Sequence, residues 1–189
     1  MRVVGLSGGL SRPSRTLGLV QAIHHHLEQR PGVVTTLLDF ADCATAFGAV
    51  LDRRDLAAEQ AAQLAALEAA DIVVIAAPVF KAAYPGLFKH FFDLLDRQAL
   101  DRKAVILAAN GASAHHALII ESHLRPLASS LGGYTVPTGI YSQTSDFSQY
   151  ALTNPDIHAR IADAVSEAWA LQGLLRRPSP VLPVGLNAA

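Results

Sequence analysis

The amino-acid sequence predicts a single α/β domain, a three-layer sandwich in which helices cover both faces of a five-stranded parallel sheet. Three observations lead to this prediction. Short apolar runs alternate with helical patterns along the chain. The run from Ile72 to Ala77 is continuously apolar, which is typical of a strand covered on both faces. No internal repeat and no second domain is visible in the sequence.

Five strands and five helices follow from these patterns. The strands are expected at residues 3–6, 33–38, 72–77, 104–109 and 135–140. The helices are expected at residues 15–29, 56–69, 85–95, 113–131 and 154–174, and residues 40–53 are expected to form a loop. Ser113 is predicted to cap the fourth helix, and Asn154 followed by Pro155 suits the start of the last one.

The alternation also restricts the topology. Because parallel crossovers are right-handed, few strand orders remain, and the simplest for five strands is 2-1-3-4-5, the flavodoxin-like order. In that order strands 1, 3 and 4 are central, and ligands bind beyond their carboxyl ends. We expect residues 1–175 to form this one domain and residues 176–189, with three prolines, to form an arm or a disordered end.

Composition and charge disfavour several classes of protein. A chain of 189 residues with 51% hydrophobic and 16% charged residues is long enough to bury a full core and too apolar for disorder. A net charge of −1 gives no basic surface for nucleic acid. No apolar run reaches the roughly 18 residues of a membrane helix, and no signal peptide is apparent. The single cysteine, Cys43, excludes an internal disulfide and fits the cytoplasm.

The loop after the first strand is a candidate phosphate site. In SGGLSRPSRT (residues 7–16), the free N–H groups of a helix N-terminus lie beside four hydroxyls and two arginines. A dianionic phosphate would find many hydrogen-bond donors there. The segment lacks the lysine of a nucleoside-triphosphate loop and the GxGxxG of a dinucleotide loop. We predict a mononucleotide phosphate site, the alternative being an ordinary Ser/Gly turn.

The loops after the third and fourth strands complete the pattern. PVFKAAYPG (residues 78–86) offers apolar and aromatic surface to a flat ring, although on its own it would suit a core or an interface better. NGAS (residues 110–113) presents N–H groups that would stabilise charge on a reduced ring, the alternative being a Gly turn with a Ser cap. All three loops fall on one sheet edge, which matches a mononucleotide with a phosphate at one end and a ring at the other.

The chain also resembles a known family. The segments VVGLSGGLSRPSRTL, PVFKAAYPGLFKHFFDLL, ASAHHALIIESHLRPL and VPTGIYSQTSDF are similar to those of NADPH-dependent FMN reductases, in the flavodoxin-like superfamily. The third segment points to the reductases of methanesulfonate and alkanesulfonate systems. The resemblance implies reduction of free FMN by NADH or NADPH and delivery of FMNH₂ to a partner flavin-dependent monooxygenase.

The resemblance further implies which residues bind the flavin. The phosphate would be held by Ser7, Arg12, Ser14, Arg15 and Thr16, the ribityl chain and ring flanked by Pro78, Val79, Phe80 and Tyr84, and the ring edge met by Asn110, Gly111 and Ser113. One departure concerns the two adjacent glycines that the family usually has after strand 4. This chain has Gly111-Ala112, and the extra methyl group would narrow the approach to the ring.

The two cofactors would supply the chemistry. A hydride would pass from nicotinamide C4 to flavin N5, while the protein supplies stacking, orientation and electrostatics. We therefore expect no catalytic side chain and no metal site. Ser7 and His116 do not indicate a hydrolase, because no G-x-S-x-G elbow exists. The choice between NADH and NADPH stays open, with Arg12, Arg15 or Lys81 as partners for a 2′-phosphate.

Two of the predicted helices have more apolar surface than one core needs. In the helix at residues 113–131, Leu118 and Ile119 fall outside the core stripe. The helix at residues 85–95 has a wide apolar arc, formed by Leu87, Phe88, Phe91, Phe92, Leu94 and Leu95. This excess predicts a subunit interface, and the resemblance implies a homodimer or homotetramer through this region.

The histidines fall into two groups. His24, His25 and His26 are consecutive on a helix, cannot face one site, and are expected on a solvated face. For His116, the resemblance implies the position of a one-residue helix bulge near the flavin. We hypothesise that His116 helps to control flavin exchange across the subunit interface, the alternative being a plain interface histidine.

Rival functions of the same fold also stay open. An electron carrier that keeps FMN permanently usually has a strongly acidic surface, whereas this chain has a net charge of only −1. Such a carrier would oxidise almost no NAD(P)H when FMN is added. A reductase that keeps FMN and reduces quinones, azo dyes or metal oxyanions is separated only by product analysis. A phosphatase needs a cysteine in the first loop, and a phosphoacceptor needs an aspartate where this chain has Ala77 and Pro78.

Overall fold

The computed structural model describes residues 1–176, so the predicted Pro-rich tail, apart from Arg176, lies outside the described residues. The central sheet is parallel and has the order β2-β1-β3-β4-β5. Its strands are β1 (Arg2–Ser7), β2 (Val34–Asp39), β3 (Ile72–Pro78), β4 (Ala104–Gly111) and β5 (Tyr134–Thr135). Another strand, β6 (Ile140–Gln143), also pairs with β4. The predicted α/β class and strand order are confirmed.

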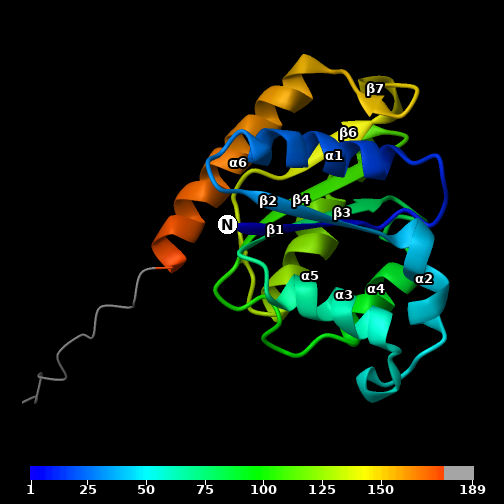
Figure 1. The fold of residues 1–189 in the computed structure, drawn as a ribbon. Coiled ribbons are helices and arrows are strands. Elements are labelled where there is room, and N and C mark those ends of the chain that lie inside the picture. The colour runs from blue at the N-terminus through cyan, green and yellow to red at the C-terminus, as the bar shows by residue number, and fades with distance from the viewer. Residues whose placement is uncertain (177–189) are drawn as a thin grey trace, which may run out of the picture.

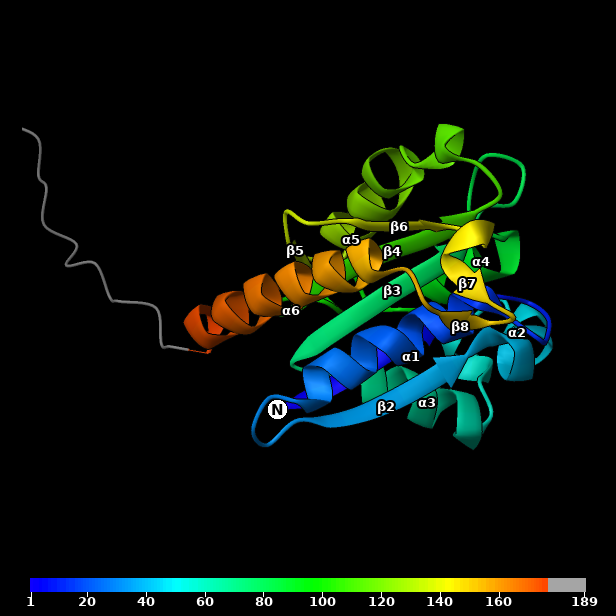
Figure 2. The ribbon, with the colours of Figure 1, turned by 90° about the horizontal axis from the view of Figure 1, so that it is seen from above.

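Helices cover both faces of this sheet (Figures 1 and 2). On one face lie α1 (Arg15–Glu28) and α6 (Pro155–Leu175), and on the other α2 (Phe40–Gly48), α3 (Ala58–Glu68), α4 (Gly86–Asp93) and α5 (Arg125–Ser130). Each face has its own apolar cluster, because β3 and β4 bury side chains on both sides. Asn154 caps α6 by accepting from Asp156 N–H at 2.9 Å, as predicted.

Most of the segment at residues 40–53 is helical, so the predicted loop is wrong for residues 40–48 and holds only for residues 49–52. Asp39 caps α2 by accepting from Ala41 N–H, and η1 (Arg53–Asp55) follows as a short 3₁₀ turn. One face of α2 is apolar at helical spacing, and Phe40 and Phe47 stack edge-on against Phe91 of α4. These aromatic contacts therefore stabilise a short helix where the sequence predicted a loop.

The predicted fifth strand is split into β5 and β6. Pro137, in the gap, has no N–H to give to a ladder. Side chains bond several other backbone groups of the gap: Arg125 donates to Val136 C=O at 2.8 Å, and Arg160 donates to Gly139 C=O at 2.5 Å. These tertiary bonds replace the sheet pairing that a continuous strand would have had.

The helix predicted at residues 113–131 is interrupted. It begins with a 3₁₀ turn, η2 (Ala114–His116), capped by Ser113, and continues as a π-helical segment, η3 (Ile120–Leu124), before α5. The helix bulge expected at His116 therefore lies at residues 120–124. Pro126 has no N–H to donate to the carbonyl one turn earlier. The preceding N–H, that of Arg125, donates to Ile120 C=O five residues back, which is the π-helical pattern.

Several residues expected at the surface or at an interface are buried in this chain. His24 is 7% exposed, which contradicts the solvated face expected for it. Ile119 also belongs to the core, and so do all members of the apolar arc of α4 except Leu87, which is 38% exposed. Less apolar surface is thus left for a subunit interface than the sequence suggested.

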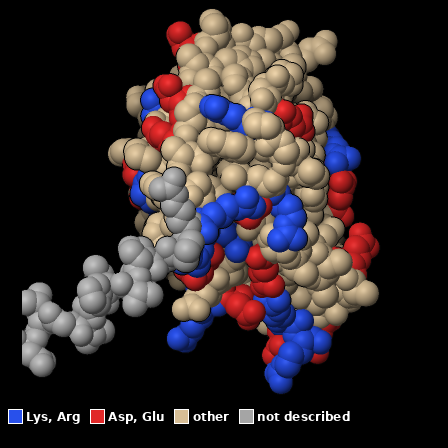
Figure 3. Space-filling view, turned by 60° about the vertical axis from the view of Figure 1, so that its left-hand side comes forward, with Lys and Arg blue, Asp and Glu red and all other residues tan. Residues whose placement is uncertain are grey.

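The surface charge is mixed. On the face shown in Figure 3, basic and acidic side chains lie next to one another rather than in a patch of one sign. Within residues 1–176, no helix is both long and apolar enough to cross a bilayer.

Candidate functional site

The loop between β1 and α1 forms one wall of a small cavity at the carboxyl edge of the sheet. Ser14 is the N-cap of α1, and its hydroxyl accepts from Leu17 N–H at 3.2 Å. The N–H groups of Arg15 and Thr16 then have no acceptor within the helix. The cavity measures about 130 Å³ and is lined by Gly9, Leu10, Ser11, Pro13, Ser14, Arg15, Thr16, Pro78, Phe80 and Asn110. It joins all three loops that the sequence singled out.

Two polar atoms at this loop are buried without a hydrogen-bond partner among the described residues. One is Oγ of Ser7, at the end of β1, and the other is Nε of Arg15 in the cavity wall. A buried donor without a partner costs about 1–3 kcal/mol. Together with the positive end of the α1 dipole, these atoms fit an anion with several acceptor oxygens.

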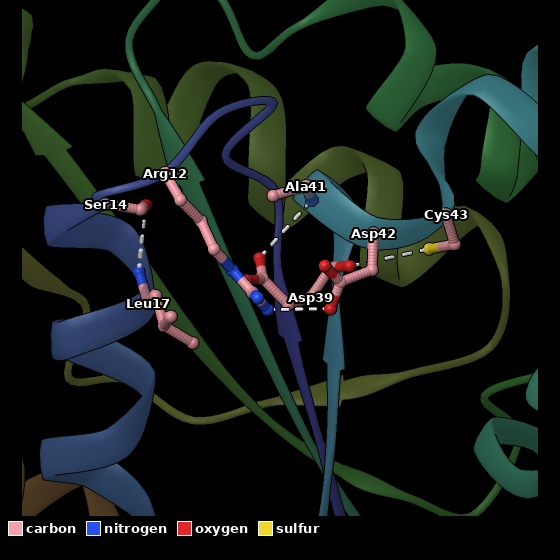
Figure 4. Close-up of polar contacts among 7 residues, drawn as sticks. All are labelled: Arg12, Ser14, Leu17, Asp39, Ala41, Asp42 and Cys43. Carbon is pink, nitrogen blue, oxygen red and sulfur yellow. Dashed lines mark hydrogen bonds and ion pairs between the residues drawn. The ribbon is translucent and has the colours of Figure 1, made fainter.

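Arg12 does not point into this cavity. Its guanidinium reaches across to the end of β2, where it pairs with Asp39 at 2.8 Å and with Asp42 at 2.6 Å (Figure 4). The hydrogen bond to Asp39 raises the pKa of Arg12 above its ordinary value. Of the five residues predicted to hold a phosphate, three line the cavity, Ser7 directly precedes the loop, and Arg12 is engaged elsewhere.

The loop after β3 is a tight turn. Phe80 N–H donates to Ala83 C=O at 2.7 Å, and Ala83 N–H donates back to Phe80 C=O at 3.0 Å. The two residues between them, Lys81 and Ala82, have positive φ angles of 50° and 68°. Neither is glycine, so the turn carries backbone strain. It holds the Phe80 side chain at 47% exposure beside the cavity.

The end of β4 connects the other two loops. Asn110 Oδ1 accepts from Thr16 Oγ1 at 2.5 Å, and Asn110 C=O accepts from Val79 N–H at 2.9 Å. A side chain at position 111 would fall closer than 3.0 Å to the Tyr141 hydroxyl, so glycine leaves room for this phenol. The neighbouring Ala112 is exposed, and its methyl group does not crowd the loop.

The titratable side chains near the cavity are not suited to acid–base or nucleophilic chemistry at neutral pH. Burial raises the pKa of Tyr84 and of Tyr141, so both phenols stay protonated at neutral pH. The Tyr141 hydroxyl donates to Ser113 C=O at 2.6 Å. Cys43 is buried on α2, and burial together with nearby carboxylates raises the pKa of its thiol to about 11. The site can bind and orient a ligand, but it offers no activated nucleophile.

A larger pocket, of about 590 Å³, lies on the outer side of the first loop, between α1 and the hairpin of β7 (Phe147–Ser148) and β8 (Ala151–Leu152). Its lining includes Arg12, Gln21 and Tyr150. The two buried unpaired atoms belong to the inner cavity and the strand before it, so we assign the anion site to the smaller space. Sequence reading missed this hairpin, because its strands have only two residues each.

His116 is exposed in the η2 turn, and Leu118, which follows it, is 73% exposed. The His123 ring lies edge-on to the Tyr84 ring, with centroids 6.1 Å apart, so η3 packs beside the start of α4. Phe80, Leu87 and Leu118 are exposed apolar side chains, and of these Phe80 lines the cavity.

Comparison with known proteins agrees with this geometry. Residues 1–147 match the family described as NADPH-dependent FMN reductase. The NADH-dependent FMN reductase SfnF of Pseudomonas fluorescens is 44% identical over 178 residues, which cover 94% of this chain and 95% of that protein. The FMN reductase (NADPH) of Pseudomonas aeruginosa is 41% identical, over 91% of this chain and 92% of that protein.

Solved structures are also similar. An oxidoreductase from Corynebacterium diphtheriae has a TM-score of 0.78 at 31% identity, over 92% of this chain and 97% of that one. The apo form of the NADH:FMN oxidoreductase EMOB has a TM-score of 0.76 at 28% identity, over 94% and 91% of the two chains. The resemblance seen in the sequence is thereby confirmed, and the chain belongs to the NADPH-dependent FMN reductase family.

Proposed function

We propose that this protein uses NADH or NADPH to reduce FMN, and that it releases FMNH₂ to a flavin-dependent monooxygenase of a sulfonate system. The observation that carries the proposal is the cavity at the N-terminus of α1, with the unpaired Arg15 Nε in its wall and the unpaired Ser7 Oγ on the strand before it. The names of the related Pseudomonas reductases support the reaction and the use of both nicotinamide cofactors.

The phosphate of FMN is proposed to bind in this cavity. Ser7, Ser14, Arg15 and Thr16 would surround it, with the N–H groups of the first helical turn as further donors. Arg12 is proposed to support the loop from outside, through its pairing with Asp39. A volume of about 130 Å³ is smaller than the roughly 300–1,000 Å³ of pockets that enclose a drug-sized ligand. The cavity would hold the phosphate end alone, which favours a flavin that exchanges.

The ring of FMN is proposed to lie over the turn after β3 and the end of β4. Pro78, Val79, Phe80 and Tyr84 would flank the ribityl chain and the ring, and Asn110, Gly111 and Ser113 would meet its edge. Asn110 Oδ1 already accepts from Thr16, so its amide N–H₂ group is left to donate. When bound, the flavin would supply the hydride chemistry, and these residues would orient it without moving protons.

The protein is proposed to work in the cytoplasm as a homodimer or homotetramer. Leu118, Phe80 and Leu87 are exposed apolar residues of the kind that a subunit interface buries. His116, exposed two residues before Leu118, is proposed to control flavin exchange. Replacing Leu118 with Lys should lower the oligomeric state in sedimentation, and replacing His116 with Ala should change the rate of flavin release. If neither substitution has any effect, this region is not the interface.

The central test is the oxidation of NADH and of NADPH by the purified protein, with and without FMN. Oxidation that requires FMN supports a reductase, whereas a permanent electron carrier would oxidise almost none. Arg15→Gln should weaken FMN binding by about tenfold or more, because a hydrogen bond to a charged group is lost. Arg97→Gln removes an equal charge far from the cavity and serves as the control. A folded protein that binds no FMN would refute the proposal.

Release of the product needs a separate measurement. Ultrafiltration after reduction without oxygen would show whether FMNH₂ passes through the membrane or stays with the protein. Retained flavin, together with electron transfer to a quinone or an azo dye, would favour the FMN-retaining alternative instead.

A further inference from the structure

The β7–β8 hairpin lies directly against the N-terminal part of α1. A side chain at Gly18 would come closer than 3.0 Å to the Tyr150 carbonyl oxygen, so the backbone of the hairpin touches the helix at its glycine. Phe147 and Leu152 anchor the hairpin in the core, at 9% and 8% exposure. Residues 148–152 lie beyond the part of the chain that matches the family.

The hairpin brings one aromatic ring to Arg15, a residue of the cavity wall. The guanidinium carbon of Arg15 lies over the ring of Tyr150, 5.5 Å from its centroid. Arg15 lines the cavity, and its Nε is buried without a hydrogen-bond partner among the described residues. The Arg15 guanidinium therefore lies against a ring face, while the residue itself belongs to the cavity wall.

The base of the hairpin is firmly built. Asp146 is 8% exposed and binds both ends of the segment, since its carboxylate accepts from Gln143 N–H at 2.6 Å and from the Asn154 side chain at 2.7 Å. At the tip, Gln149 has a positive φ of 55° in the two-residue turn. A non-glycine residue in this conformation is strained. The packing of the hairpin on α1 holds the turn, and Tyr150 with it, in this conformation.

We propose that Tyr150 is a positioning residue that holds the Arg15 guanidinium in place for the phosphate of FMN. This inference rests on the proposed function above. A contact with a ring face occupies the flat side of the guanidinium and leaves its N–H donors available. Arg12 presents the opposite case, because carboxylates of Asp39 and Asp42 occupy its donors. An aromatic partner thus orients Arg15 without neutralising it, and a fixed side chain loses less entropy when the phosphate binds.

The test compares FMN with riboflavin, which lacks the phosphate. Tyr150→Leu and Tyr150→Gln should each weaken FMN binding by about three- to tenfold, as expected for the loss of a cation–π contact. Riboflavin binding should stay unchanged, and Tyr150→Phe should retain the affinity for FMN. Quenching of flavin fluorescence measures all of these constants. Tyr134→Leu, at a similarly exposed tyrosine (47% against 41%), is the matched control on β5.

A double-mutant cycle gives a second readout. In an Arg15→Gln background, Tyr150→Leu should cause no further loss of FMN affinity, because no guanidinium remains to be held. If the Leu and Gln variants bind FMN as the wild type does, or lose FMN and riboflavin equally, the inference is wrong. Failure of the wild-type protein to bind FMN would instead overturn the proposed function, so the two outcomes are distinct.

Discussion

His24 should make the protein less stable as the pH falls below 6.5. Its ring is 7% exposed, and its Nε2 has no partner among the described residues. Burial, opposed weakly by Glu28, lowers its pKa from 6.5 to about 4. The unfolded chain therefore takes up a proton on His24 at a higher pH than the folded chain does. Stability is fully present above pH 6.5, declines as the pH falls toward 4, and loses no more from this group below that.

The magnitude follows from the two pKa values. Each pH unit between them is worth about 1.4 kcal/mol, so the full difference between 6.5 and about 4 is about 3 kcal/mol. Between pH 7 and pH 5 the expected loss is about 2 kcal/mol. His24→Leu removes both the titrating group and the unpaired nitrogen, so it should flatten this part of the pH dependence.

Urea unfolding of the flavin-free protein at pH 5, 6, 7 and 8 measures the effect. The other titrating groups contribute equally to wild type and variant, so the difference between the two isolates His24. His25→Leu, at the exposed neighbouring position, is the control for the loss of a histidine from α1. If wild type and His24→Leu lose stability in parallel between pH 7 and pH 5, the reasoning is refuted.

Three further predictions concern the loops of the site. Gly18→Ala should lower the free energy of unfolding by about 1–3 kcal/mol in urea titrations, because the added methyl group forces the Tyr150 carbonyl away. Ala82→Gly should raise the free energy of unfolding by up to about 1 kcal/mol, since its φ of 68° strains a residue with a side chain; a loss of stability would contradict this. Arg12→Gln should weaken FMN binding less than Arg15→Gln does, because the donors of Arg12 already serve carboxylates, and the reverse order in a fluorescence titration would contradict the site assignment.

The sheet and the position of the site could be predicted from sequence because both depend on local patterns. The apolar run from Ile72 to Ala77 has no other stable place than between two layers of helices, and its burial is complete. Parallel strands then bring their following loops to one edge. Thr16 and Asn110, 94 positions apart in the chain, are hydrogen-bonded there.

Two of the errors in the prediction had visible signals. Four apolar residues follow a helical spacing after an Asp cap and indicate a helix rather than the loop predicted above: Phe40, Cys43, Ala44 and Phe47. Pro126 lies within the predicted helix at residues 113–131, where it removes a backbone donor. In both places the signal is local: the helical spacing of apolar residues after a cap in the first, and a proline inside a helix in the second.

The burial of His24 had a partial local signal, because His24 lies four residues after Val20 and three before Leu27, on the buried face of α1. The ring occupies space beside Gly5 of β1, where any side chain would come closer than 3.0 Å to His24 Nε2. Helical spacing distinguishes His24 from the exposed His25, and the missing side chain on the neighbouring strand gives the His24 ring the space to be buried. That second part of the information lies 19 residues away in the sequence, and it can be used once α1 is placed on the sheet.

The roles of the two arginines of the first loop also depend on residues that are distant in the sequence. Arg12 and Arg15 are three residues apart, and either could be assigned to a phosphate by composition. Asp39, at the end of β2, forms an ion pair with Arg12. Tyr150 of the hairpin packs its ring against the Arg15 guanidinium. The N–H donors of an arginine that is bound to carboxylates are already used, whereas those of an arginine that packs on a ring face stay available to a phosphate. The capacity of this loop to bind a phosphate thus depends on what β2 and the hairpin present to each arginine, more than on the number of arginines in the loop.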